Sequence, residues 1–146
     1  MNSYSRAIHV NFFLDPSPNF FLSKNLFRYT PLAYACQQGG NLPTVKTLIE
    51  AGANLHQKTK DSIGLTPIHL AAQSGKIEIV RFLVRSGAEV DAKDNLGKTP
   101  LKYATSNCDD HQNPVVDFLL SKGAQMIGGD CCTKCLQEMD YLKLLA

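Results

Sequence analysis

The sequence lacks a strong excess of charge and any long apolar run. Fifteen Lys and Arg against 13 Asp and Glu give a formal net charge of +2, far from the basic surface that nonspecific binding to nucleic acid requires. A membrane-spanning helix needs about 20 predominantly apolar residues in succession, and no segment approaches this. We therefore expect neither a nucleic-acid partner nor a membrane-spanning segment.

Signs of export are also missing. The apolar clusters that begin at Phe12 and Phe20 stop after three residues, so they lack the continuous core of a secretory signal, and we expect the protein to start at Met1. No Asn-x-Ser/Thr site occurs, and the 5 cysteines are an odd set. We expect an intracellular protein, cytoplasmic or nuclear, because thiols stay reduced there.

What the chain does have is an internal repeat. Its 146 residues, 44% of them hydrophobic, suffice for one compact domain or a short repeat array. Thr-Pro dipeptides begin at residues 30, 66 and 99, and Gly-Ala dipeptides follow each of them, at 52, 87 and 123. An apolar cluster lies between the two landmarks every time. The sequence therefore predicts three similar units.

The middle unit predicts a pair of helices. Thr66 suits an N-cap and Pro67 the first helical turn, where a missing amide proton costs nothing. Gly75 and Gly87 are expected to end the two helices in a left-handed conformation. The turn-rich residues 88–98 predict a hairpin before the next unit. The expected buried positions are Ile68, Leu70, Ala71, Ala72, Ile77, Ile79, Val80, Phe82, Leu83 and Val84.

These residues resemble the ankyrin repeat, with its period of about 33 residues and its Thr-Pro-Leu-His-x-Ala signature. Residues 66–71, Thr-Pro-Ile-His-Leu-Ala, differ from the signature only at Ile68. The segments that begin at Thr30 and Thr99 match except at the histidine, which is Ala33 or Lys102. The resemblance implies an all-α repeat solenoid, an ankyrin-type stack of helix-turn-helix units joined by short β-hairpin loops.

The repeat divides the chain into three parts. Residues 1–22 are expected to be an N-terminal cap or tail with aromatic residues and prolines, and residues 127–146 a C-terminal capping helix or degenerate fourth repeat. The units between them span about 23–55, 56–90 and 91–126. The first and third carry insertions between their helices, after which Pro43 and Pro114 suit the first turn of the second helix. The loop of residues 56–65 is two residues longer than its counterpart and should project further.

Enzyme chemistry finds little support in the sequence. In the matched motif, His69 is expected to bond the Thr hydroxyl and nearby backbone, which is a structural role. Gly97-Lys98-Thr99 copies the end of a phosphate-binding loop, but Ala92 stands where that loop needs a glycine. No Gly-x-Ser-x-Gly occurs, and the four histidines fall in unrelated places. We therefore predict a protein that is not an enzyme and has no cofactor.

A metal site is the sharpest chemical alternative. Cys108 and His111 form one Cys-x-x-His pair, and Cys132 and Cys135 form a Cys-x-x-Cys pair, enough ligands for tetrahedral zinc. The repeat, however, separates the two pairs by one inner-helix length, roughly 12 to 15 Å. We therefore predict no metal, and loose thiols instead. Cys36 replaces Ala72 of the matched helix and should be a small core residue.

A binding surface is the remaining prediction. The resemblance implies that partners bind along the groove formed by the hairpin tips and the ends of the inner helices. The candidate residues are Phe27, Tyr29, Gln37, Gln38, Ser62, Ile63, Leu65, Gln73, Ser74, Lys93, Asn95, Leu96, Lys98, Ser106 and Asn107.

Apolar residues at hairpin tips are unusual, because turn tips are normally polar. Ile63, Leu65 and Leu96, next to Tyr29, predict an apolar strip. Its expected rim comprises Lys58, Lys60, Lys93 and Lys98. A protein partner with an apolar anchor and acidic flanks would fit this strip, although the apolar residues could instead fold back onto neighbouring hairpins.

We therefore predict a monomeric, non-enzymatic module for protein–protein interaction, acting as an adaptor, scaffold or inhibitor. One alternative is a zinc- or redox-responsive switch that uses Cys108, His111, Cys131, Cys132 and Cys135. Another is the ankyrin portion of a bacterial effector that acts on host proteins after delivery into the host cytosol.

Overall fold

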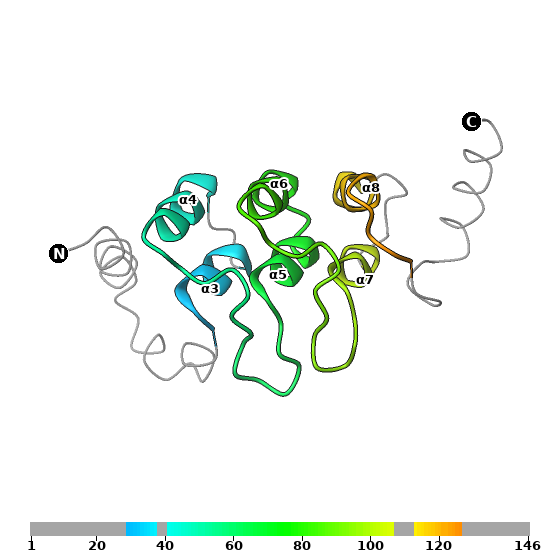
Figure 1. Cartoon of the computed structure of the whole chain (residues 1–146), viewed down its shortest axis with the longest axis horizontal. Helices are drawn as coiled ribbons and strands as arrows, with labels where there is room; N and C mark the ends of the chain where they lie inside the picture. Colours follow the sequence, from blue (N-terminus) through cyan, green and yellow to red (C-terminus); the bar gives the residue numbers. More distant parts are fainter. Residues whose placement is uncertain (1–28, 38–40, 107–112, 127–146) are drawn as a thin grey trace.

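The computed structural model describes residues 29–37, 41–106 and 113–126, and these residues form three pairs of helices. α3 (Pro31–Gln37) packs on α4 (Leu42–Glu50), α5 (Pro67–Gln73) on α6 (Ile77–Arg85), and α7 (Pro100–Thr105) on α8 (Pro114–Ser121). Figure 1 shows α3, α5 and α7 side by side in an inner row, with α4, α6 and α8 in an outer row. The predicted all-α repeat stack is confirmed.

Each inner helix begins at the proline of a Thr-Pro dipeptide. Pro31, Pro67 and Pro100 are the first residues of α3, α5 and α7, as predicted for the middle unit. The predicted left-handed stops are confirmed as well, because Gly75 and Gly87 have φ of +70° and +101°. Any side chain at these two glycines would be strained. Proline and glycine together therefore set the start and end of the helices.

The outer helices of the first and third units begin at asparagine caps. The Asn41 side-chain oxygen accepts a hydrogen bond from the Thr44 N–H at 3.0 Å, and that of Asn113 accepts one from the Val115 N–H at 3.0 Å. The Asn113 amide also donates to the Ala104 carbonyl of α7 at 2.9 Å. Asn113 therefore starts α8 and at the same time fixes it to its inner helix.

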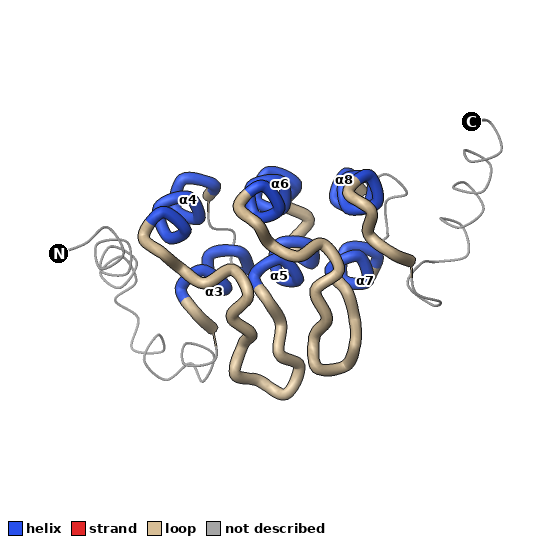
Figure 2. Tube along the Cα trace, in the orientation of Figure 1, coloured by secondary structure: helices blue, strands red, loops and turns tan. Residues whose placement is uncertain are grey.

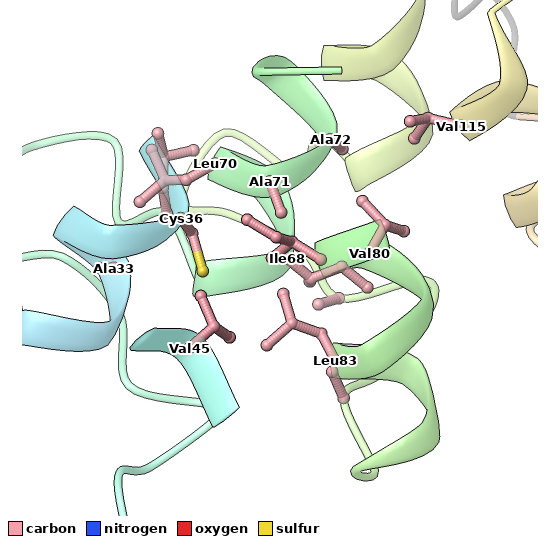
Figure 3. Packing of buried hydrophobic residues seen from close by; sticks show 14 of the residues in the cluster. Ala33, Cys36, Val45, Ile68, Leu70, Ala71, Ala72, Val80, Leu83 and Val115 are labelled. Atoms are coloured by element: carbon pink, nitrogen blue, oxygen red, sulfur yellow. The ribbon is translucent and has the colours of Figure 1, made fainter. Parts of the chain in front are cut away.

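The hydrophobic core runs continuously through the stack. Cys36 and Val45 of the first unit meet Ile68 and Leu83 of the second in Figure 3, all of them fully buried or nearly so. Of the positions predicted to be buried, those of the inner helix α5 are all confirmed. Stacking thus buries faces that no unit could cover alone.

On the outer helix α6 the prediction of burial is only partly right. Ile79, Val80 and Leu83 are buried, whereas Ile77, Phe82 and Val84 are half-buried. The reason is that α6 packs on one inner helix and two outer neighbours, and no other helix in the described part of the chain covers its outer face. A lysine of the preceding unit covers part of this face. Lys46 Nζ, from α4, lies 5.6 Å from the centre of the Phe82 ring.

Two loops project from the inner row. We call residues 56–65 the first loop and residues 91–98 the second loop; both turn back on themselves like hairpins and are drawn in tan in Figure 2. The Thr59 N–H donates to the Leu65 carbonyl at 2.8 Å, and the Asp94 N–H to the Lys98 carbonyl at 3.0 Å. Within the residues that the structure describes, neither loop contains a β-strand.

Candidate partner-binding surface

The tips of the two loops expose apolar side chains. Ile63 is 36% exposed and Leu96 is 63% exposed, and they are the exposed large hydrophobic residues within the described part of the chain. Ser62, Lys93, Asn95 and Lys98 are exposed around them. The structure thus places the tip residues of both loops on the surface, where a partner can reach them.

Leu65 does not belong to this strip, so its inclusion was wrong. Its side chain is only 5% exposed and is part of the core. The cause is the base of the first loop, where the Leu65 N–H donates to the Thr59 hydroxyl at 2.8 Å and its carbonyl accepts from the Thr59 N–H. Tyr29 is half-buried and packs against the core. Ile63 and Leu96 therefore remain as the exposed apolar pair.

The rim lysines of the two loops face the solvent, whereas Asp61 of the first loop turns inward. All four rim lysines, Lys58, Lys60, Lys93 and Lys98, are exposed. Asp61, in contrast, turns into the first loop, where one carboxylate oxygen accepts from the Thr59 hydroxyl and from the Ile63 and Gly64 N–H groups at 2.8–3.1 Å. The surface of the first loop therefore presents more cationic character than its composition suggests.

Asp94 fills the same position in the second loop and is buried. Its carboxylate accepts from the Leu96 and Lys98 N–H groups, each at 2.8 Å, and from the Tyr103 hydroxyl at 2.7 Å. Burial by itself raises the pKa of Asp94, but these three hydrogen bonds outweigh it and hold the pKa below its usual value. Asp94 therefore stays ionised inside the loop.

Asn95 connects the two loop tips. Its N–H donates to the Ile63 carbonyl at 2.9 Å, its side-chain nitrogen lies 3.4 Å from the Ser62 carbonyl, and its side-chain oxygen lies 3.3 Å from Lys58 Nζ. The two tips consequently lie against each other and do not project independently.

Two serines at the ends of the inner helices make hydrogen bonds within the stack. The Ser74 hydroxyl is held by the Cys36 carbonyl of the first unit at 3.1 Å and the Ala71 carbonyl at 3.0 Å, so it joins two units. The Ser106 hydroxyl donates to the Lys102 carbonyl at 2.8 Å. Gln73 is exposed and Gln37 is half-buried. Phe27, Gln38 and Asn107 lie outside the described residues.

Comparison with known proteins identifies the repeat. The family model for ankyrin repeats, in three copies, matches residues 32–130. The chain belongs to the ankyrin-repeat family. Ankyrin repeats generally mediate contacts between proteins.

The individual relatives share parts of this ankyrin array. Protein phosphatase 1 regulatory subunit 27 of Homo sapiens is 43% identical over 61 residues, which are 42% of this chain and 38% of the relative. The human transient receptor potential cation channel subfamily A member 1 is 38% identical over 98 residues, or 65% of this chain and 8% of the channel. Neurogenic locus notch homolog protein 1 of Xenopus laevis is 34% identical over 91 residues, 53% of this chain and 4% of the relative. The chain thus spans well under half the length of each.

The ankyrin histidine has the predicted structural role. His69 is fully buried, and its Nδ1 lies 2.8 Å from the Thr66 hydroxyl and 3.2 Å from the Thr66 N–H. Because an N–H can only donate, Nδ1 is the acceptor, and the ring proton belongs on Nε2, which lies 3.1 Å from the Lys98 carbonyl. Burial lowers the pKa of His69, so the ring stays neutral.

Cys36 is a core residue of the ankyrin stack, as predicted. It is fully buried, and desolvation raises the pKa of its thiol to about 12. Cys108, His111, Cys131, Cys132 and Cys135 lie outside the described residues. In the described ranges, no group of three or more His, Cys, Asp or Glu residues could hold a metal ion.

A hollow lies beside the first ankyrin unit, with a volume of about 330 Å³. Its described lining contains no titratable side chain: Thr30, Leu32, Ala51, Gly52, Ala53, Asn54 and Gln57.

No helix within the part of the chain that the structure describes is long and apolar enough to cross a membrane.

Sequence reasoning missed the residues that shape the loops. Asp61 and Asp94 occupy the same position, five residues before the second and third Thr-Pro dipeptides, and this recurrence is a sequence signal for a shared role. Carboxylates at such positions commonly accept hydrogen bonds from the backbone of their own turn. The contacts of Asn95 and Tyr103 left no such signal, because their partners lie in other units or other elements.

Proposed function

We propose that this ankyrin chain is a non-enzymatic adaptor, scaffold or inhibitor that binds a protein partner through the tips of its two loops, assisted by the exposed ends of the inner helices. The exposure of Ile63 and Leu96 carries this proposal. Apolar side chains at the tips of otherwise polar loops lose contact with water when a partner covers them, which favours association. We place this activity inside the cell, in the cytoplasm or nucleus.

The partner is expected to have an apolar anchor with acidic flanks. Four exposed lysines surround the apolar pair, whereas Asp61 and Asp94 turn into their loops. Acidic residues on a partner would meet these lysines without facing an exposed carboxylate of the tips. Such complementarity raises the association rate and weakens as salt is added.

The relative named as a regulatory subunit of protein phosphatase 1 supports the same class of activity. Its name describes a protein that regulates another protein, a phosphatase. We carry over this mode of action and not the identity of the partner, because the similarity covers 38% of that relative.

Affinity purification with a matched pair of variants tests the proposal. The variant Ile63→Asp with Leu96→Asp puts charge at both tips, and we expect it to lose most of the partners that the wild-type protein retains. The control, Pro43→Asp with Pro114→Asp, changes two exposed prolines at the starts of α4 and α8. Acidic residues are tolerated there because the helix dipole favours them. Equal recovery of a validated partner by both variants and wild type would reject the proposed surface.

A designed probe tests the charge of the partner. It is a fluorescent peptide with a central leucine and three glutamates on each side, and its two controls replace the glutamates by lysines or the leucine by serine. We expect the glutamate peptide to bind more tightly than either control, by about tenfold, and to weaken between about 0.05 and 0.3 M salt. Equal affinities for the three peptides would reject the prediction that the partner has acidic flanks. The proposed binding surface would then still be tested by the affinity purification.

A further inference from the structure

We infer that Asn95 is a positioning residue that locks the two loop tips into one binding surface. The inference rests on the proposed function, which treats Ile63 and Leu96 as a single apolar pair although they come from different units. One backbone hydrogen bond joins the two loops, from the Asn95 N–H to the Ile63 carbonyl. The Asn95 side chain adds two contacts to the first loop, and the positioning role is assigned to these.

The contacts of Asn95 reach three groups of the first loop. Its backbone N–H donates to the Ile63 carbonyl at 2.9 Å. Its side-chain nitrogen approaches the Ser62 carbonyl at 3.4 Å, and its side-chain oxygen faces Lys58 Nζ at 3.3 Å. The amide orientation follows from these partners, since a carbonyl accepts and an ammonium donates. The side chain thus bridges both sides of the first loop.

Gly64 makes room for this bridge. A Cβ at Gly64 would lie 2.5 Å from the Asn95 side-chain nitrogen, and φ at this glycine is +66°. An alanine there would have to displace the Asn95 side chain, in addition to its own backbone strain. The close approach shows that the Asn95 side chain packs onto the first loop.

The second loop provides a firm base for Asn95. Asp94, directly before it, accepts hydrogen bonds from Leu96, Lys98 and Tyr103, the last of these from α7. Contacts with α7 and within the second loop therefore fix the position of Asn95. The contacts of Asn95 with Ser62 and Ile63 in turn fix the tip of the first loop, which belongs to the second unit.

Amide hydrogen exchange of the free protein tests this inference without a partner. In Asn95→Ala, we expect the Ile63, Gly64 and Leu65 amides to exchange about tenfold faster or more, while the Leu96 and Lys98 amides keep their protection. Gly64→Ala should reproduce the pattern at Ile63 and Leu65, because it displaces the same side chain. Lys93→Ala, an exposed change in the same loop, is the control and should alter neither set. Unchanged exchange of the first loop in Asn95→Ala would overturn the inference.

A double-mutant cycle with the glutamate peptide separates positioning from direct contact. If Asn95 positions Ile63, then Ile63→Ser weakens binding less in the Asn95→Ala background than in wild type. If Asn95 merely touches the peptide, the two losses multiply independently, and the positioning role is rejected. A wild-type protein that does not bind the peptide would count against the proposed partner chemistry, while hydrogen exchange would still decide the role of Asn95.

Discussion

The helices α5 and α7 begin with the same Thr-Pro dipeptide, yet the two threonines have different surroundings. At α5, the Thr66 hydroxyl and N–H both face His69 Nδ1, and the other ring nitrogen reaches the Lys98 carbonyl of the second loop. At α7, Lys102 occupies the position of the histidine. The Thr99 hydroxyl is fully buried and, alone among the described buried side-chain polar groups, has no hydrogen-bond partner.

The comparison of the two helix starts indicates the role of the histidine. His69 joins the start of its own helix to the loop that leads into the next unit, and its ring meets Tyr103 of α7 edge to face, with the ring centres 5.5 Å apart. It therefore connects two units and not only one helix start. The α3 helix shows the simpler arrangement, in which Ala33 replaces the histidine and the Thr30 hydroxyl accepts from the Ala33 N–H at 3.1 Å.

The largest effect is expected from removing the imidazole. His69→Ala leaves the Thr66 N–H without its partner, removes one of the two hydrogen bonds to the Lys98 carbonyl, and opens a cavity at a fully buried position. We expect the free energy of unfolding to fall by about 3 kcal/mol, measured by urea denaturation. Lys102→Ala, at the matching position of α7, should cost less than about 1 kcal/mol. Equal losses in the free energy of unfolding for His69→Ala and Lys102→Ala would contradict the special role of the histidine at the start of α5.

The two threonines should respond differently to the same substitution. Thr66→Val removes the hydroxyl that bonds His69, so we expect a loss of about 1 to 2 kcal/mol in the free energy of unfolding. Thr99→Val removes a buried hydroxyl that has no partner, so we expect a change within about 0.5 kcal/mol or a small gain. Thermal unfolding of both variants checks this pair, and a destabilised Thr99→Val would show that its hydroxyl is satisfied after all.

A smaller loss is expected from Tyr103→Phe. The substitution removes the hydrogen bond to Asp94 but keeps the ring against His69. We expect about 1 kcal/mol less stability, together with a rise in the Asp94 pKa, because the hydroxyl is one of the groups that hold that pKa down. Carboxyl titration by NMR measures the pKa, and an unmoved value would contradict this role of Tyr103.

The smallest effect concerns pH. The pKa of His69 in the folded protein lies below its usual value of 6.5 because of burial, with a smaller contribution from Lys58. The folded state therefore binds fewer protons than the unfolded chain, and stability present above pH 6.5 is lost as the pH falls toward the folded pKa. Asp94, whose carboxylate raises the pKa of the ring, keeps its charge throughout this range because its own pKa is held below its usual value. Urea denaturation from pH 7.5 to 5 should show this loss in the wild type and a weaker pH dependence in His69→Ala.

Local rules explain why so much of the helical structure was predictable. Thr66, Pro67, Gly75 and Gly87 act within one or two turns, so their effect on helix ends follows from neighbouring residues. His69 was predictable for the same reason on its Thr66 side. Its contact with Lys98, 29 residues away, depends on the stacking of units, which no local rule describes.

The candidate surface was predictable only in part. Ile63 and Leu96 are exposed as expected, whereas Leu65, two residues from Ile63, is buried. Lys98 stands at the position of Leu65 in the next unit and is exposed, so the repeat pattern gave no warning. The difference arises from the Thr59 bonds at the base of the first loop, and the second loop has Ala92 at the position of Thr59.

Residue spacing is enough to predict the three helix pairs of the described residues, together with helix ends and buried faces, because these depend on short-range backbone preferences repeated at a fixed period. The folded structure was needed to show which loop residues face the solvent, that Asp61 and Asp94 turn inward, and that Asn95 joins the two tips. These outcomes depend on groups brought together from different units, where hydrogen-bond geometry and available space, and not sequence spacing, select the partner.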